Sequence, residues 1–353
     1  MKKQLTFLAA LLALASLLAI AGCRQKITEI MTVTGATPLA LQEPVPAGRS
    51  LVISGLVKKE YRLSSYTLNK FATARIRTRE VSPSGEYEGA YVYTGIPLYN
   101  ILEGVTPKKP ENAPFDRPLD MAVVFHSSSG KTAWFSYGEL VMTDDRHPCT
   151  LAFHRRQVLP SKDPEQYTKN KHKDDLRGLR LVCPRDPDTA RYLDDVEKIT
   201  LTVLHAPDAI LPVMKKGAEC ASRGIVIIEK DAGKPVSFAG AARQKATGWV
   251  RIGHGRGYKG ISKAEGYGLR EVLKKNFRAC GPDKFFLFVA CDGYRVLFSG
   301  REIFLTNDGT SYLIVDTLDG RKATGNYMLA PVDDYFVDRD VWGLSHIVML
   351  DAR

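Results

Sequence analysis

The sequence lacks the short motifs that assign many enzymes directly. It has no Cys-x-x-Cys pair, which argues against a zinc ribbon or a thioredoxin-like protein. It has no recognisable Ser-His-Asp arrangement, P-loop or pair of catalytic carboxylates. It also lacks the periodic glycine triplets of a collagen-like fibre, and with 25% charged residues it is too polar for a membrane bundle. These patterns therefore assign neither catalytic nor metal-ligating residues.

The N-terminal 23 residues have the pattern of a secretory signal peptide. Lys2 and Lys3 precede an apolar run, Leu5 to Ala21, which is followed by Gly22 and Cys23. This ending resembles the bacterial lipobox, whose cysteine is lipidated; small residues also suit an ordinary cleavage site, but the cysteine favours the lipobox. We therefore expect a signal peptide over residues 1–23, lipidation at Cys23 and a proline-containing tether over residues 24–47. The folded part would be anchored in the bacterial cell envelope, facing the periplasm or the exterior.

The mature chain is basic. Removal of the two signal-peptide lysines leaves 48 Lys and Arg against 39 Asp and Glu, a balance of +9. This charge suits an anionic small molecule, an acidic partner or the lipid surface, although a solvated surface near anionic lipid would carry it equally well. Nucleic acid is not an expected partner outside the cytoplasm.

Five cysteines remain in an oxidising compartment. Cys149 with Cys183 and Cys220 with Cys280 are candidate disulfides, which would leave Cys291 as a buried thiol.

The sequence contains an internal repeat in three blocks. The segment from Tyr87 to Leu102 matches the segment from Tyr258 to Leu273 at an offset of 171 residues. The second block aligns Gly130, Phe135, Ser136 and Glu139 with Gly293, Phe298, Ser299 and Glu302, and a third, weaker block aligns Pro184, Arg191 and Ile199 with Pro331, Arg339 and Ile347. The repeat predicts two domains of one kind, over residues 48–205 and 206–353, with an extra polar loop over residues 160–175 in the first.

Each repeat is expected to be α+β and mostly β, with short helices. Runs rich in branched and aromatic residues predict strands at Leu51–Val57, Met121–Phe125, Ile225–Ile228, Phe285–Ala290 and Tyr312–Val315. Apolar residues at helical spacing predict short helices at Pro97–Leu102 and Leu269–Phe277. The stretch from Asp292 to Arg295 has the composition of a tight turn between two strands.

The order of these blocks resembles the sulfite-oxidase-type molybdopterin-binding oxidoreductase domain in two tandem copies. The segments that carry the resemblance are Leu51–Val57, Tyr93–Leu102, Leu179–Pro184 and Val196–Ile199 in the first copy, and Tyr267–Leu273, Cys291–Arg295 and Ile347–Leu350 in the second. The resemblance implies a molybdopterin cofactor and an envelope redox partner. It also implies a cysteine ligand for molybdenum, but no cysteine lies between Cys23 and Cys149, and of the family's His-Gly-x-Pro-x-Arg segment only Arg180 remains.

Two groups of residues are candidates for binding a pterin phosphate or a similar anion. Arg75, Arg77 and Arg79 alternate with Ile76 and Thr78, so on a strand the three guanidinium groups would share one face. The same pattern is typical of a solvated edge strand whose charge discourages pairing.

The second group is Arg251, His254 and Arg256, which stand among Gly253, Gly255 and Gly257. A glycine-rich loop can approach an anion closely, although such loops are also common simple connections.

Two hypotheses follow. The first is an envelope lipoprotein whose two molybdopterin-oxidoreductase-like domains bind a pterin cofactor or a similar anionic ligand, within a redox system. The second is a cofactor-free binding or assembly module that kept the fold and lost the chemistry.

Overall fold

The computed structural model describes residues 43–143, 147–158, 176–214, 224–230, 232–322 and 326–352. The structure is 47% strand and 14% helix, so the prediction of a mostly-β fold with short helices is confirmed. No helix of the described residues has the length and apolar character needed to cross a membrane. The signal peptide, Cys23, Cys220 and the loop over residues 160–175 lie outside the described residues.

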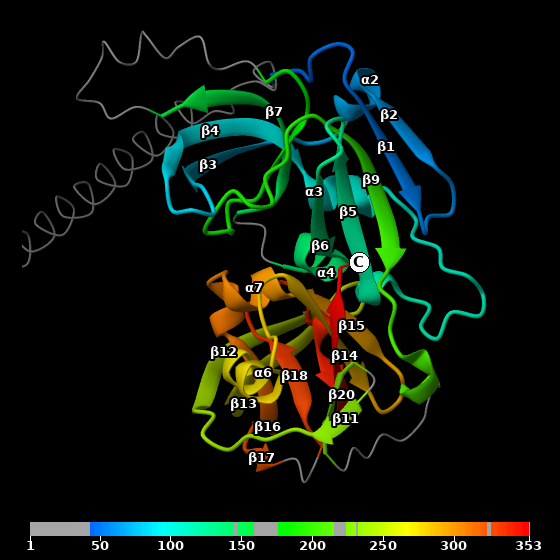
Figure 1. Cartoon of the computed structure of the whole chain (residues 1–353), viewed down its shortest axis with the longest axis vertical. Helices are drawn as coiled ribbons and strands as arrows, with labels where there is room; N and C mark the ends of the chain where they lie inside the picture. The colour runs from blue at the N-terminus through cyan, green and yellow to red at the C-terminus, as the bar shows by residue number, and fades with distance from the viewer. Residues whose placement is uncertain are drawn as a thin grey trace, which may run out of the picture. The chain divides into compact units, whose positions relative to one another are not determined.

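Residues 48–205, called the first half below, contribute two sheets (Figure 1). One has the order β2-β1-β9-β5-β6, in which only β1 and β9 are parallel neighbours. Its strands are β1 (Ser50–Gly55), β2 (Tyr61–Ser64), β5 (Met121–Ser127), β6 (Thr132–Ser136) and β9 (Val196–Val203). The other is antiparallel with the order β3-β4-β7-β8, formed by β3 (Ala74–Val81), β4 (Tyr87–Pro97), β7 (Thr150–Gln157) and β8 (Arg180–Val182).

Residues 206–353, called the second half, also contribute two sheets. One has the order β11-β10-β20-β14-β15, with β10 (Val226–Glu229), β11 (Ala232–Pro235), β14 (Lys284–Ala290), β15 (Arg295–Ser299) and β20 (Leu344–Asp351). The other has the order β12-β13-β16-β18-β19, with β12 (Arg243–Gly253), β13 (Gly257–Gly268), β16 (Tyr312–Leu318), β18 (Met328–Pro331) and β19 (Val341–Trp342), and β17 (Arg321–Lys322) beside β16.

The described helices are all short. The α-helices are α2 (Ser65–Leu68), α3 (Leu98–Glu103), α4 (Tyr137–Val141), α6 (Leu269–Asn276) and α7 (Gly300–Phe304). The 3-10 helices are η2 (Pro118–Asp120), η4 (Asp208–Ile210), η5 (Asp308–Thr310) and η6 (Val337–Arg339). Helices α4 and α7 each begin with a capping box, in which a serine hydroxyl and a glutamate carboxylate satisfy backbone N–H groups reciprocally.

The two halves share one strand topology. In the second half β10 is parallel to β20 and antiparallel to β11, and β20 is antiparallel to β14, which pairs with β15; β1, β9, β2, β5 and β6 are related in the same way. The sequence repeat falls on corresponding elements, because Gly130 and Gly293 both lie in the turns of β-hairpins with φ of 81° and 87°. The exact domain boundaries stay a prediction.

The expected elements lie where the patterns placed them. All five predicted strands and both predicted helices form, with ends that differ from the predicted ones by at most three residues. The reason is burial: β5 and β14 consist almost wholly of buried apolar residues, and α3 and α6 bury one apolar face in the main core.

The cysteine pairing differs from the expectation. Cys149, Cys183 and Cys280 are free thiols, whereas Cys291 is disulfide-bonded. The candidate disulfide between Cys149 and Cys183, the bridged Cys280 and the free Cys291 are therefore all wrong predictions. Cys291 follows β14 at the entrance to a turn, so it does not lie within the buried strand. Cys149 and Cys183 are buried beside one another, one position beyond the β7–β8 pair Thr150 and Val182, and are hydrogen-bonded as thiols.

Candidate functional site

The predicted arginine row forms on β3. Arg75, Arg77 and Arg79 are exposed, whereas the alternating Ile76 and Thr78 are buried, as a strand requires. Successive arginines are about 6.8 Å apart along such a strand. Their side chains make no ion pair with any described carboxylate, and all three arginines are exposed.

A fourth arginine lies on the same face of this sheet. Arg77 is opposite Val92 on β4, and Val92 is opposite Arg156 on β7. Residues directly opposite one another on neighbouring strands share a face, so the exposed Arg156 extends the row in the second dimension. Figure 1 shows β3, β4 and β7 side by side. We call Arg75, Arg77, Arg79 and Arg156 the arginine face.

Arg180 belongs to the opposite, buried side of this sheet. Its guanidinium group contacts Glu80 at 3.3 Å and Asp194 at 2.5 Å. Glu80 is 2% exposed and also accepts hydrogen bonds from the hydroxyls of Tyr93 at 2.6 Å and Thr78 at 3.0 Å. Burial raises the pKa of Tyr93, so this phenol remains a hydrogen-bond donor. Arg180 thus pairs with the buried Glu80 and with the exposed Asp194, and it does not join the arginine face.

The predicted residues of the second half lie on another sheet, and they differ in exposure. Arg251 packs between the rings of Trp249 and Trp342, with its Cζ 5.0 and 5.2 Å from their centroids, and lies 3.7 Å from Asp340. Burial raises the pKa of Asp340 well above its usual range, against the opposing effect of Arg251. Neither carboxylate oxygen of Asp340 has a hydrogen-bond partner among the described residues.

His254 and Arg256 are exposed in the β12–β13 hairpin. The backbone N–H of His254 donates to Asp338 at 2.6 Å, and its ring meets Phe336 edge to face at 4.9 Å. The flanking Gly255 and Gly257 have φ of 70° and 73°, which explains the glycines by turn geometry.

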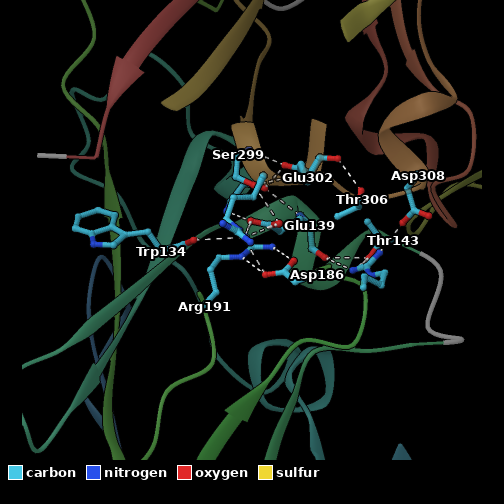
Figure 2. A network of polar contacts seen from close by, with 12 residues as sticks. Trp134, Glu139, Thr143, Asp186, Arg191, Ser299, Glu302, Thr306 and Asp308 are labelled. Atoms are coloured by element: carbon cyan, nitrogen blue, oxygen red, sulfur yellow. Dashed lines mark hydrogen bonds and ion pairs between the residues drawn. The ribbon is translucent and has the colours of Figure 1, made fainter. Parts of the chain in front are cut away.

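A buried polar network joins the two halves (Figure 2). None of the candidate residues from the sequence belongs to it. The capping glutamates Glu139 and Glu302 are 4% and 3% exposed. Ser136 donates its hydroxyl to Glu302 at 2.9 Å, and Ser299 donates its hydroxyl to Glu139 at 3.1 Å. Each half therefore completes the hydrogen bonding of the other half's carboxylate.

Each half also supplies one arginine to this network, and the two arginines make corresponding contacts. Arg191 contacts Glu139 at 3.0 Å and Asp186 at 2.6 Å. In the second half Arg339, which is 0% exposed, contacts Glu302 and Asp334, both at 2.6 Å. The sequence repeat aligns these serines, glutamates and arginines. It therefore marks the residues of the network but does not predict their contacts.

Burial dominates the electrostatics of the network. It raises the pKa of Glu139 to about 7 and that of Asp334 to about 6, in both cases against the opposing effect of an arginine. Every charged oxygen of Glu139 and Asp334 has a donor. The network is consequently a joint between the halves, with its donors and acceptors satisfied internally.

A solvent-open groove of about 1190 Å³ lies beside β10, β11 and β20. Ile228, Val348 and Leu350 contribute to its floor, and the exposed cations Lys230 and Arg278 lie at its edge. Glu229 and Asp351 also line the groove. Its charge is therefore mixed, unlike that of the arginine face.

The candidate residues do not fit a buried molybdopterin. Of the seven predicted residues, three lie on the arginine face, Arg180 and Arg251 are held by carboxylates, and His254 and Arg256 are exposed on a hairpin. None of the seven lines the groove or the small buried hollow next to Glu139. They do not surround one cavity.

Two of the described cysteines are protonated thiols. Burial raises the pKa of Cys183 well above its usual range and that of Cys280 to about 12, so neither is a thiolate near neutral pH. Within the described part of the chain, no group of three or more His, Cys, Asp and Glu side chains is placed to hold a metal ion.

The sequence matches no protein-family model and has no significant match among curated proteins. Among solved structures, the chain is similar to the crystal structure of the sulfane dehydrogenase SoxCD from Paracoccus pantotrophus, with a TM-score of 0.32 and 12% identity, over 86% of this chain and 78% of that chain. A likeness at this level is too distant to identify a fold family. The sulfite-oxidase-type resemblance of the two halves therefore stays a prediction.

Proposed function

We propose that this chain is a lipoprotein of the bacterial cell envelope that binds an anionic ligand through the arginine face, and that it works without a molybdenum cofactor. Its two halves would be sulfite-oxidase-like domains that kept the fold and lost the chemistry. The observation that carries the proposal is the row Arg75, Arg77 and Arg79, which is exposed and lacks described ion-pair partners.

The proposal is supported by the contrast between buried and exposed arginines. Arg180, Arg191 and Arg339 are all held by carboxylates. A guanidinium group that already has a carboxylate partner cannot offer the same hydrogen bonds to a ligand, whereas the arginine face retains its full donor set. The basic balance of the mature sequence agrees with an anionic ligand.

The binding test compares two charge-matched variants. In the first, Arg75, Arg77 and Arg79 are replaced by glutamine; in the second, the exposed Lys58, Lys59 and Lys70 are replaced by glutamine. With inorganic tripolyphosphate as the probe in calorimetry, we expect the arginine variant to lose at least about tenfold in affinity, since exposed charge contacts contribute up to about 1 kcal/mol each. Equal affinities in the two variants would show that net charge alone is responsible.

The cofactor part has a separate test. Protein purified from its native envelope is analysed for molybdenum and for pterin fluorescence. We expect neither at stoichiometric levels, and one molybdenum per chain would overturn the cofactor-free proposal in favour of the pterin hypothesis.

The anchor is tested by the substitution Cys23→Ala. Loss of this thiol should abolish the incorporation of labelled palmitate into the protein, because the lipid is attached to Cys23. Palmitate labelling that stays unchanged would contradict lipidation at this cysteine.

A further inference from the structure

We propose that the ligand of the arginine face is an extended acidic segment of a partner protein, which pairs with β3 as an added strand. This inference rests on the proposed function, and it adds the chemical class and the backbone geometry of the ligand. It requires an open strand edge, a matching charge period and no competing carboxylate within the sheet.

No described strand covers the outer edge of β3. Within the described part of the chain, β3 is outermost in the sheet order β3-β4-β7-β8 and pairs only with β4. Beyond that ladder, the one described backbone hydrogen bond to β3 is donated by Thr189 to the carbonyl of Val81 at 2.9 Å, at the end of the strand. Between Ala74 and Glu80 the outward N–H and C=O groups thus have no described backbone partner and can pair with another strand.

The charge period of the row is that of a β-strand. An arginine occurs at every second residue, so a paired strand with an acidic residue at every second position would place each carboxylate opposite one guanidinium group. Directly opposed residues have Cβ atoms about 4.5–5.5 Å apart, which is within reach of a charge-assisted hydrogen bond. Arg156 adds positive charge two strands further across the same face.

In the second half, the residue that corresponds to Arg75 has a carboxylate partner within its own sheet. Thr94 on β4 and Glu265 on β13 occupy corresponding positions, because each comes directly before a glycine near the end of its strand. Thr94 is paired with Arg75, and Glu265 is paired with Lys245. Lys245 contacts Glu265 at 3.0 Å, and the neighbouring Arg243 contacts Asp316 at 2.7 Å. In the first half the acidic position is a threonine, so Arg75 has no carboxylate opposite it.

Two features favour an acidic strand over free phosphate or a lipid surface. A phosphate or an anionic headgroup uses charge alone and has no need of the backbone edge. A strand uses the backbone edge and the two-residue period together, and both are present on β3.

The test measures peptide binding to the mature protein by fluorescence anisotropy. The probe is an octapeptide of alternating Glu and Thr. Its controls are a block isomer with four Glu followed by four Thr, and the alternating peptide N-methylated at every second residue, which removes hydrogen-bond donors without changing charge. We expect the alternating peptide to bind about tenfold more tightly than either control.

Protein variants assign the site. The substitutions Arg75→Gln, Arg77→Gln and Arg79→Gln together should abolish the preference for the alternating peptide, whereas Lys245→Gln in the second half should leave it unchanged. Tripolyphosphate and vesicles of phosphatidylglycerol are measured in parallel as the other anion sources.

The outcomes separate the two proposals. Equal binding of the alternating and block peptides, or binding of tripolyphosphate or vesicles with no peptide preference, would overturn the added strand while the anion-binding function holds. Binding of no anionic probe at all would overturn the proposed function as well.

Discussion

Replacement of Arg339 by methionine tests whether the buried network depends on arginine compensation. The side chain is 0% exposed and donates hydrogen bonds to both oxygens of Asp334, to Glu302 and to the hydroxyl of Tyr312, at 2.6, 2.6, 2.6 and 3.2 Å. Methionine has a similar length but no charge, so two buried carboxylates would lose their cation. Removing one partner of a buried ion pair costs about 3–5 kcal/mol.

The loss should also depend on pH. Burial raises the pKa of Asp334 to about 6 even beside Arg339, so without the arginine this carboxyl takes up a proton more readily. We therefore expect the free energy of unfolding to fall by about 3–5 kcal/mol at pH 8 and by less at pH 5, where protonation removes part of the uncompensated charge.

Urea unfolding followed by tryptophan fluorescence measures both values. Arg339→Lys, which keeps a charge without the planar fork, should lose less than the methionine variant. The exposed Arg77→Met serves as the control and should change stability by less than about 0.5 kcal/mol. A loss below about 1 kcal/mol for Arg339→Met, or a loss equal at both pH values, would refute the reasoning.

Two further substitutions test the same joint. Gly138→Ala would place a methyl group 2.3 Å from Cδ of Arg339, so we expect a loss of about 1–3 kcal/mol in urea unfolding, whereas Gly104→Ala, with its nearest atom at 3.4 Å, should be tolerated; equal losses would contradict the close approach. Burial raises the pKa of Glu139 from 4.5 to about 7. The contribution of the protonated Glu139 to the free energy of unfolding is therefore fully present below pH 4.5 and is lost as the pH rises towards 7. Glu139→Gln should remove this decline, and its stability relative to the parent should grow by up to about 3 kcal/mol between pH 4.5 and pH 8; parallel pH profiles would show that Glu139 does not titrate in this range.

Local patterns predicted the elements because each pattern has a direct physical cause. The alternation of Arg75, Ile76, Arg77 and Thr78 corresponds to a strand with one exposed face, which the structure has. The apolar runs became buried strands for the same reason. These features depend on residues close together in sequence, so a single sequence contains them.

Local patterns do not predict contacts between residues that are distant in the sequence. The ion pairs of Arg180 with Glu80 and of Arg251 with Asp340 join residues from separate segments, so residue type alone does not reveal that either arginine has a partner. The prediction of a free, buried thiol at Cys291 is wrong because the apolar run before this residue indicates burial within the strand, whereas the strand ends at Ala290. The repeat aligns Glu139 with Glu302 but carries no information that each glutamate accepts a hydrogen bond from the serine of the other half.

The exchange of serine hydroxyls between the halves has the form of an isologous contact, in which each side offers the other the same group. A chain carrying one copy would satisfy its buried glutamate by associating with a second, identical molecule across a twofold axis. Covalent linkage of two copies keeps that contact at any protein concentration and releases the two sequences from identity. One copy can then keep bare cations at its sheet edge while the other neutralises its own.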